Sequence, residues 1–276
     1  MTQPSIADSA SQRCKVSFSS VNKFYGNRNA NGATTLALQD FNLDIAPQEI
    51  VTIVGPTGCG KSTSLNLLAG FEQPSTGQVR VDGQVVKRTG PDRGVVFQQP
   101  SLFPWLTVLD NVTLGVKCRG GDADEYGPRA LRLIAEVGLK GFERHYPYQL
   151  SGGMQQRVQI ARALVNQPDI LLMDEPFGAL DYQTRLLMQK LLLRLWEHFR
   201  PTILFITHDV GEAIFISDRV IAMTKRPGRV KCELRVHAPK PRGYEFMASE
   251  EFTRLERELI LAVQSEVEGD DVAAAH

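Results

Sequence analysis

The sequence contains few cysteines, and they are widely spaced. Cys14, Cys59, Cys118 and Cys232 form no C-x-x-C pair, and the histidines form no cluster at zinc-ligand spacing. This pattern argues against a structural zinc site and indicates a chain that works in the reduced cytoplasm.

Long apolar runs and a surplus of one charge are also missing. No run approaches the ~20 apolar residues of a membrane-spanning helix. The start, MTQPSIADSASQR, lacks the apolar stretch of a secretory signal. Lys and Arg total 31, as do Asp and Glu, so the charge balance favours neither nucleic acid nor an anionic membrane surface. We therefore expect no nucleic-acid partner and no passage across a bilayer by this chain alone.

The most informative feature that is present is a phosphate-binding loop. Residues 55–62 read GPTGCGKS and fit the pattern G-x-x-x-x-G-K-[ST]. A β-branched run precedes them at 49–54 and a helix-compatible segment follows at 62–69, which is the order of strand, loop and helix that the motif requires. The glycines let backbone N–H groups surround a polyphosphate, Lys61 reaches its outer phosphates, and the Ser62 hydroxyl is a Mg²⁺ ligand. The sequence predicts a nucleoside triphosphatase.

The expected nucleotide-binding residues of this loop are consecutive: Gly55, Pro56, Thr57, Gly58, Cys59, Gly60, Lys61, Ser62 and Thr63. An ordinary glycine-rich turn is the alternative, and the fit at every motif position argues against it. Because Cys59 lies inside the loop, alkylation of an accessible thiol there should block ATP binding, and bound nucleotide should protect it.

Two apolar runs end in residues suited to catalysis. ILLMDEP ends in Asp174 and Glu175, and ILFITHD contains His208 after its last apolar residue. Parallel sheets bind ligands at the carboxyl ends of their strands, so we expect Asp174 to hold Mg²⁺, directly or through water, and Glu175 to polarise the attacking water. The His208 imidazole can hydrogen-bond the γ-phosphate and help position that water. An acidic strand end is the alternative for Asp174 and Glu175, and the loop upstream favours catalysis there. For His208, a structural histidine remains the alternative.

The organisation of the 276 residues is that of an α/β fold. Antiparallel strands are expected within 14–45, apart from a polar surface loop at 27–35, and a hairpin at 78–86 around an Asp-Gly turn. Continuous apolar runs predict buried parallel strands, and helical spacing predicts helices. The runs are 94–97, 169–173, 202–206 and 219–223, and the expected helices are 129–137, 153–165 and 250–263.

These elements predict the following division of the chain. Residues 1–13 are expected to be a disordered segment. Residues 14–97 and 167–236 are expected to form an ATP-binding α/β core with antiparallel strands, residues 98–166 an α-helical subdomain inserted in it, and residues 237–276 a short C-terminal helix with an acidic tail.

Between the two motifs, residues 149–164 read QLSGGMQQRVQIARAL, and here the chain resembles the ATP-binding subunits of ABC transporters. Ser151, Gly152, Gly153 and Gln155 match the signature of that family, whose physical basis is a capped helix N-terminus with N–H donors facing an anion. The resemblance implies that this anion is the γ-phosphate of ATP bound by a second subunit, here most simply another copy of the chain. It also implies a P-loop NTPase (RecA-like) core with an antiparallel β subdomain and an inserted α-helical subdomain.

Other residues match the family one by one. Tyr25 aligns with the aromatic residue that stacks on adenine, with Phe24 or a core role for Tyr25 as alternatives. Gln98, rather than Gln99, aligns with the glutamine that contacts Mg²⁺ and water, so the resemblance implies ATP and Mg²⁺ as cofactors. The implied metal ligands are Ser62, Gln98 and Asp174, the implied catalytic residues are Glu175, His208 and Gln98, and Asp181 is the implied dimer contact.

Two segments resemble one subfamily of importers, which carry nitrate, sulfonates and taurine. They are FPWLTVLDN after Gln98 and MTKRPGRV at 223–230. A third segment, EPFGALDYQTR at 175–185, resembles bacterial importer ATPases more than exporters. The apolar residues around Trp105 either receive a membrane subunit or pack against their own lobe. The resemblance implies partner permease subunits, a periplasmic or lipid-anchored solute-binding protein, and a peripheral location on the cytoplasmic face of the inner membrane. An exporter ATPase and a soluble ABC-type ATPase of translation or DNA repair are the alternatives.

Overall fold

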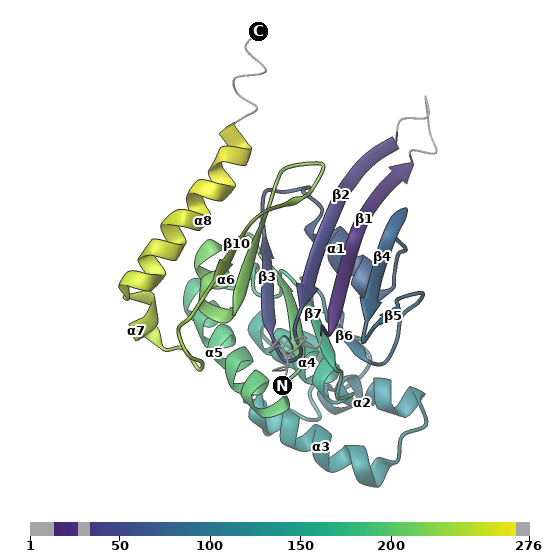
Figure 1. The fold of residues 1–276 in the computed structure, drawn as a ribbon. Coiled ribbons are helices and arrows are strands. Elements are labelled where there is room, and N and C mark those ends of the chain that lie inside the picture. The colour runs from purple at the N-terminus through teal and green to yellow at the C-terminus, as the bar shows by residue number, and fades with distance from the viewer. Residues whose placement is uncertain (1–13, 27–33, 269–276) are drawn as a thin grey trace, which may run out of the picture.

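The computed structural model describes residues 14–26 and 34–268, and the strands in this part of the chain form a four-stranded and a six-stranded sheet (Figure 1). The expected disordered segment 1–13, most of the expected loop 27–35 and the end of the acidic tail lie outside the described residues. In the described ranges, no helix is both long and apolar enough to cross a membrane.

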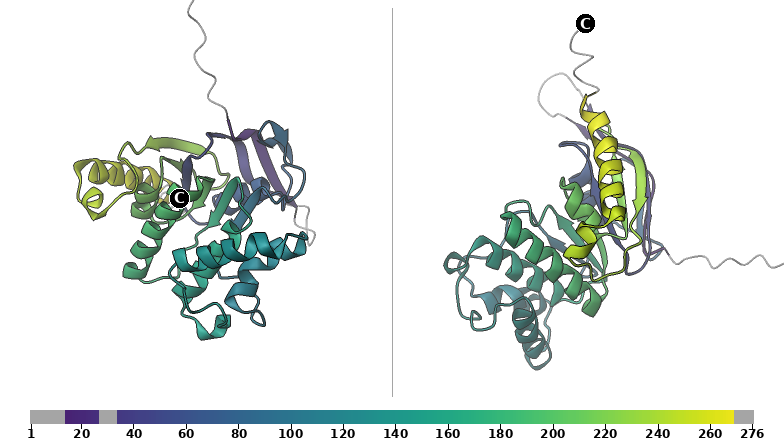
Figure 2. Two further views of the ribbon diagram at one scale, coloured as in Figure 1. Left: turned by 90° about the horizontal axis from the view of Figure 1, so that it is seen from below. Right: turned by 90° about the vertical axis from the view of Figure 1, so that its left-hand side faces the viewer.

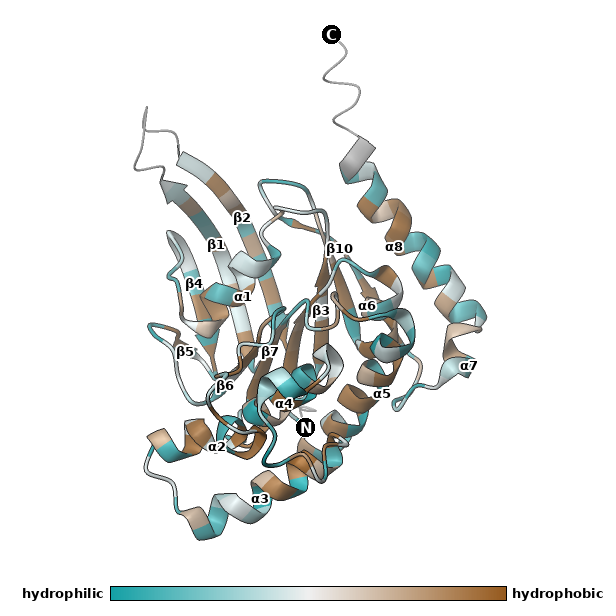
Figure 3. Cartoon of the chain, turned by 180° about the vertical axis from the view of Figure 1, so that it is seen from behind, coloured by the Kyte–Doolittle hydropathy of each residue, from teal (hydrophilic) through white to brown (hydrophobic). Residues whose placement is uncertain are grey.

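The six-stranded sheet has the strand order β10-β9-β3-β8-β7-β6. Its strands are β3 (Ile50–Val54), β6 (Arg93–Val96), β7 (Ile170–Asp174), β8 (Thr202–Ile206), β9 (Arg219–Met223) and β10 (Val230–Arg235). All neighbours pair in parallel except β10, which is antiparallel to β9. β3 and β8 are buried along their whole length, as expected for parallel strands covered on both faces, and Figure 3 shows the apolar character of the central strands.

The four-stranded antiparallel sheet has the order β2-β1-β4-β5. It contains β1 (Val16–Gly26), β2 (Thr34–Ile45), β4 (Thr76–Val81) and β5 (Gln84–Val85). The hairpin expected around Asp82 and Gly83 is confirmed: Val81 pairs with Gln84, and both turn residues have positive φ, 48° and 76°. Positive φ at both central positions is the requirement of a type I′ turn.

Alternation along β3 divides the hydrophobic core into two clusters. Val51 and Ile53 belong to the cluster that fills the space toward the four-stranded sheet and α1 (Lys61–Ala69). Ile50 and Val54 belong to the cluster on the other face, with residues of α5 (Tyr182–Phe199) and α6 (Val210–Ile216). Successive side chains of a strand point to opposite faces, so this one strand contributes to both clusters.

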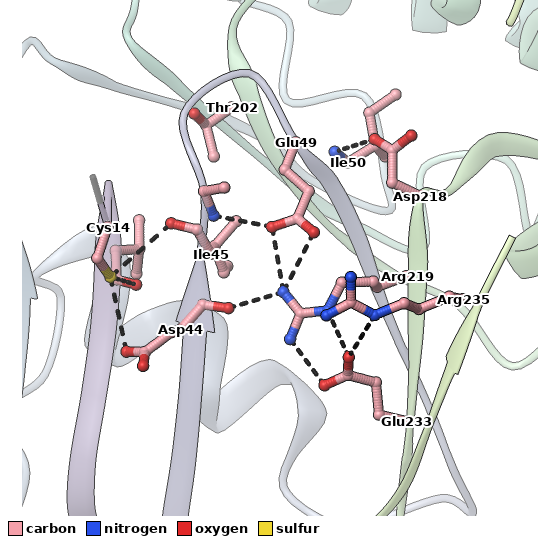
Figure 4. A network of polar contacts seen from close by, with 12 residues as sticks. Cys14, Asp44, Ile45, Glu49, Ile50, Thr202, Asp218, Arg219, Glu233 and Arg235 are labelled. Atoms are coloured by element: carbon pink, nitrogen blue, oxygen red, sulfur yellow. Dashed lines mark hydrogen bonds and ion pairs between the residues drawn. The ribbon is translucent and has the colours of Figure 1, made fainter. Parts of the chain in front are cut away.

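Arg219 connects the two sheets (Figure 4). Its guanidinium donates to the backbone carbonyl of Asp44 in β2 at 2.8 Å and to the carboxylates of Glu49 and Glu233 at 3.1 and 2.8 Å. Hydrogen bonding to Glu233 and the charge of Glu49 outweigh partial burial and raise the pKa of Arg219. The sheets are therefore held in register by a charged cluster at the start of β9 as well as by apolar packing.

Between β6 and β7 the chain forms a helical region, seen at the lower end of the molecule in Figure 1. It contains α2 (Val108–Cys118), α3 (Ala123–Glu136), the 3₁₀ turn Pro147–Gln149 and α4 (Gly152–Leu164). The helices expected at 129–137 and 153–165 are present as α3 and α4. The helix α2 was not predicted, because its valines, threonine and glycine have low helix propensity; packing against α3 and α4 stabilises it.

The C-terminal segment forms α7 (Tyr244–Met247) and α8 (Glu250–Glu268), so the helix expected at 250–263 is present and longer. α8 lies along the outside of the molecule against α6, β9 and β10, as both views in Figure 2 indicate. Its apolar stripe is buried and includes Phe252, Leu255 and Leu259. The strand β10 was also missed, although its sequence VKCELR alternates apolar and charged residues, as suits an edge strand with one face in solvent.

Candidate nucleotide-binding site

The loop between β3 and α1 has the geometry of an anion cradle. Gly58 and Gly60 have φ of 79° and 101°, in the left-handed region that favours glycine. A Cβ at Gly60 would lie 2.7 Å from the Leu38 side chain, so a larger residue would force the loop away from β2. Gly60 also caps α1 without any side-chain hydrogen bond. The first N–H groups of α1 are thus open to an anion, whose charge the helix dipole favours.

Lys61 and Ser62, the first residues of α1, are both held in place. The Lys61 side chain is buried, and its ammonium donates to the carbonyls of Gly55 at 2.8 Å and Pro56 at 3.1 Å. The Ser62 hydroxyl donates to Asp174 Oδ1 at 3.2 Å. Burial raises the pKa of Asp174, while the bond from Ser62 acts in the opposite direction. A hydroxyl and a carboxylate oxygen therefore meet directly beside the loop.

Glu175 and His208 also meet, because β7 and β8 are neighbours and end at the same edge of the sheet. Glu175 Oε2 lies 3.0 Å from His208 Nδ1. The Glu175 amide donates to the Ile206 carbonyl at 2.9 Å, and its φ is 43°, which is rare for a non-glycine residue. Such strained residues cluster at functional sites, where the surrounding structure holds them.

A pocket of about 260 Å³ opens over the loop. Its lining residues come from the antiparallel sheet, the loop, α1 and the ends of β7 and β9: Tyr25, Thr35, Ala37, Thr57, Gly58, Gly60, Lys61, Ser62, Thr63, Glu175 and Arg226. A larger hollow of about 650 Å³ lies at the amino ends of β7 and β8, near Lys15 and Asp169. Of these two hollows, only the smaller one is lined by the phosphate loop and lies at the carboxyl ends of the strands, where α/β sheets bind ligands.

Tyr25 lies at the rim of this pocket, whereas Phe24 is not among the residues that line it. The Tyr25 hydroxyl donates to Glu72 at 2.8 Å, and Lys23 lies 5.0 Å from the centre of the ring. The ring is partly exposed and is not part of either core cluster. Of the two aromatic candidates, Tyr25 is therefore the one available to stack on a base.

The side chain of Cys59 packs in the core and does not line the pocket. Its thiol is buried in the core cluster that includes Leu65 and Met223, and a Cβ at Gly55 would lie 2.9 Å from its sulfur. The expected block of ATP binding by alkylation depended on an accessible thiol, and that condition is not met, because the Cys59 side chain packs in the core.

Burial makes Cys59 a poor target for alkylation. Burial raises the pKa of the Cys59 thiol, so the reactive thiolate is scarce at neutral pH. We expect iodoacetamide to modify the exposed Cys118 at least ~10-fold faster than Cys59 in the folded chain, with or without nucleotide. Peptide mass spectrometry after timed alkylation measures both rates, and urea-unfolded chain is the control in which the difference should disappear. Rapid, nucleotide-protected labelling of Cys59 would contradict this geometry.

The remaining expected site residues lie elsewhere, and none is among the described residues that line the pocket. Ser151 caps α4, accepting from the Met154 amide at 3.3 Å, and Asp181 caps α5, accepting from the Thr184 amide at 3.0 Å. Gln155 donates to the carbonyls of Pro147 and Leu150, so its amide supports the turn before Ser151. Gln98 is exposed just beyond the end of β6.

Two arginines were missed as candidates. Arg226 lines the pocket, and its Nε donates to the Gly58 carbonyl at 3.3 Å. Arg185 donates to Asp209 at 2.9 Å and to the Leu180 carbonyl at 3.1 Å, which ties the loop after β7 to the loop that carries His208. Only a three-dimensional contact distinguishes these arginines from surface ones, although the segment 223–230 had already stood out in the sequence.

A Gly-Lys-Ser loop between a central strand and a helix, with a carboxylate at the end of the next strand but one in the same sheet, defines a P-loop nucleoside triphosphatase. The comparisons narrow this class. The family model described as ABC transporter matches residues 38–178, and the chain belongs to the ABC transporter family.

Curated relatives cover most of the chain. The taurine import ATP-binding protein TauB of Rhizobium johnstonii is 47% identical over 83% of this chain and 89% of its own length. The nitrate import ATP-binding protein NrtD of Synechocystis sp. is 45% identical over 82% of this chain and 87% of its own length. A solved dimeric ATP-binding cassette in a post-hydrolysis state, bound to ADP and Pi, is 37% identical, with a TM-score of 0.70 over 81% of this chain and 100% of that chain.

These similarities confirm the expected P-loop fold with its antiparallel sheet and helical region. They also confirm the expected activity class: the chain binds and hydrolyses ATP.

Proposed function

We propose that this chain is the ATP-hydrolysing subunit of a bacterial importer, in which two copies close on ATP and drive uptake of a small solute through membrane subunits. The names of its relatives, which are import subunits for taurine and for nitrate, support a solute of the nitrate, sulfonate and taurine kind. They do not favour the exporter or the soluble ATPase. The structural observation that carries the proposal is Trp105, which is 70% exposed and lies seven residues after Gln98 in the sequence.

We assign nucleotide binding to residues 55–63 and Tyr25. The open amides at the start of α1 and the Lys61 ammonium face the phosphates, and the Tyr25 ring stacks on the adenine at the other end of the pocket. Mg²⁺ prefers a few protein oxygens together with phosphate oxygens and waters. The Ser62 hydroxyl and the Asp174 carboxylate, 3.2 Å apart, fit that preference, and Gln98 would complete the set from the end of β6. Bound Mg²⁺ would neutralise phosphate charge.

Hydrolysis is assigned to the Glu175 and His208 pair. Glu175 orients the attacking water and accepts its proton. An imidazole protonated on both ring nitrogens would donate from Nδ1 to Glu175 and from Nε2 to the γ-phosphate. Gln98 lies at the junction of the α/β core and the helical region, so a contact between Gln98 and bound nucleotide can change the position of the helices. The Asp209 carboxylate, held by Arg185, also caps α6 and fixes the loop around His208.

A second copy of the chain completes each site. Ser151, Gly152 and Gly153 begin α4 away from the pocket of their own chain, so their amides can serve ATP only on a partner. Asp181, at the start of α5, is assigned to the contact between copies. The dimeric assembly of the similar ATP-binding cassette supports this arrangement. ATP is then the ligand that favours the closed pair, and hydrolysis releases it.

The division of the chain follows the same logic. Residues 14–97 and 167–236 hold ATP, residues 98–166 carry the signature helix and the partner surface, and residues 237–276 form the C-terminal appendage. The permease subunits bind at the helical region, on the cytoplasmic face of the inner membrane, and a periplasmic or lipid-anchored solute-binding protein delivers the solute. The balanced charge of the chain supports the absence of a nucleic-acid partner.

Trp105 provides the test. It lies 5.5 Å from Phe103, centre to centre, and an exposed aromatic pair of this kind suits the apolar face of a partner helix. We expect Trp105→Ala to reduce recovery of a multispanning permease from gently solubilised native membranes by about 10-fold or more, because truncating a central aromatic hot-spot residue costs ~2 kcal/mol or more of binding free energy, and ~1.4 kcal/mol already corresponds to 10-fold in affinity. Basal ATP hydrolysis should change less than twofold.

The matched control is Leu261→Ala, which removes an apolar side chain of similar exposure from α8. It should leave permease recovery unchanged. Mass spectrometry of the co-purified proteins measures both. Equal losses of hydrolysis and recovery in Trp105→Ala would make Trp105 a structural residue. Recovery of ribosomes or repair factors in place of a permease would overturn the importer role.

A further inference from the structure

The loop between β9 and β10, residues 224–229, packs against the phosphate loop. Gly228 donates to the Ala37 carbonyl at 2.9 Å and accepts from the Gln39 amide at 3.0 Å, which joins it to β2. A Cβ at Gly228 would lie 1.9 Å from the carbonyl oxygen of Cys59. Only glycine permits so close an approach, so this position sets the distance between the two loops. Figure 1 shows both loops at the same end of the six-stranded sheet.

This packing brings Arg226 into the nucleotide pocket. Its Nε donates to the Gly58 carbonyl at 3.3 Å, and a Cβ at Gly58 would lie 3.2 Å from its Nη2. The side chain is otherwise exposed and lines the pocket together with Lys61 and Thr57. A guanidinium carries five N–H donors, so bonding to Gly58 leaves others for a ligand. Its planar, permanently charged group suits phosphate oxygens.

The C-terminal helix reaches the same loop from the other side. Glu266, in the last turn of α8 whose side chains are described, accepts from the Lys225 amide at 2.9 Å and pairs with Lys231 at 2.6 Å. Lys225 precedes Arg226 directly. One carboxylate of α8 therefore fixes the backbone next to the arginine that faces the nucleotide.

We infer that Arg226 is a second cationic ligand of the nucleotide polyphosphate beside Lys61, and that Glu266 of α8 positions it. The inference rests on the nucleotide site proposed above. It adds a binding residue from outside the phosphate loop and gives the C-terminal helix a contact through which nucleotide binding and the position of α8 are linked. By reciprocity, whatever displaces α8 would weaken nucleotide binding, and bound nucleotide would hold α8 in place.

Binding of ADP to the full-length chain tests the role of Arg226 without hydrolysis. We expect Arg226→Ala to raise the Kd for ADP about 10-fold, the effect of losing one charge-assisted hydrogen bond. The same variant should raise the Kd for inorganic tripolyphosphate by a similar factor and leave the Kd for adenosine unchanged. Arg226→Lys, which keeps the charge, should recover part of the loss. Calorimetric titration measures each Kd.

Two comparisons make the result decisive. Arg229→Ala removes the same charge from the same loop, at a residue that bonds Gln39 and lies outside the pocket, and should leave every Kd unchanged. Lys61→Ala is measured in parallel. If Lys61→Ala raises the Kd for ADP and Arg226→Ala does not, only the inference about Arg226 fails. If neither variant raises the Kd for ADP, the proposed site itself fails. An equal loss of affinity for adenosine in Arg226→Ala would also show that Arg226 does not act through the phosphates.

A double-mutant cycle tests the positioning role of Glu266. Glu266→Ala should raise the Kd for ADP about threefold in the original chain and add nothing in the Arg226→Ala background, because the two residues act on one contact. Glu266→Gln, whose amide oxygen can still accept from the Lys225 amide, should restore most of the affinity. Additive losses, or the same loss in both backgrounds, would show that Glu266 affects nucleotide binding by another route.

Discussion

Glu175→Gln is expected to lower the rate of ATP hydrolysis by about 10²- to 10⁴-fold, which is the usual contribution of a general base. Glutamine keeps the size of the side chain and can still bond His208, so the geometry at the end of β7 is retained and only the basic carboxylate is lost. ATP affinity should change less than twofold, since neither Lys61 nor the amides of the loop are altered. With hydrolysis blocked, the closed pair should accumulate.

Size-exclusion chromatography with light scattering, in ATP and Mg²⁺, measures that accumulation. The wild-type chain should elute as a monomer or as monomer and dimer in rapid exchange. The Glu175→Gln variant should elute as a dimer that retains ATP. The matched control is Glu258→Gln, an exposed residue of α8, which should behave as wild type. A monomeric Glu175→Gln variant with normal turnover would refute both the catalytic assignment and the dimer.

The second large effect is expected from two inactive variants that restore activity when mixed. Lys61→Ala removes the ammonium of the phosphate loop, and Ser151→Asp puts a carboxylate where the partner's γ-phosphate should lie. Aspartate is as good a helix cap as serine, so α4 should remain folded. Each variant alone should lose hydrolysis by ~100-fold or more.

A mixture distinguishes composite sites from independent ones. In a 1:1 mixture, half of the pairs contain one copy of each variant, and each such pair has one intact site of two. Activity should therefore return to about a quarter of wild type, the value set by twofold symmetry. Steady-state phosphate release measures it, and mixtures of each variant with a Lys61→Ala/Ser151→Asp double variant, which cannot form an intact site, are the control. No recovery would mean that Ser151 serves ATP on its own chain, or not at all.

The sequence identified more of the site's chemistry than of its supporting contacts. The Gly-Lys-Ser loop, the Asp-Glu strand end and the histidine at the end of the next strand carried enough local pattern to be found, because their function requires fixed residue types at fixed spacing. Parallel pairing then explains why Glu175 and His208 meet, although 33 residues separate them. Arg226 and Arg185 carried no such pattern, since their roles depend on which loops fold against each other.

The direction of the Cys59 side chain shows the same limit at one residue. Its place in the motif indicated a residue beside the nucleotide, but it is not among the residues that line the pocket. The buried thiol instead fills the core beside Met223 of β9. Likewise α2 was missed because its stability comes from packing against α3 and α4 and not from the preferences of its own residues.

By itself, then, the sequence determined the class of the protein, the buried parallel strands, the phosphate loop and the residues at the strand ends. Each of these is encoded locally, by the periodicity of apolar residues or by a short motif whose chemistry tolerates little variation. Only the tertiary structure decided which loops touch: that Gly228 lies against Cys59, that Arg226 enters the pocket, and that Glu266 of α8 holds the loop that carries it. Contacts between segments far apart in the chain depend on the packing of the whole core, which no local pattern records.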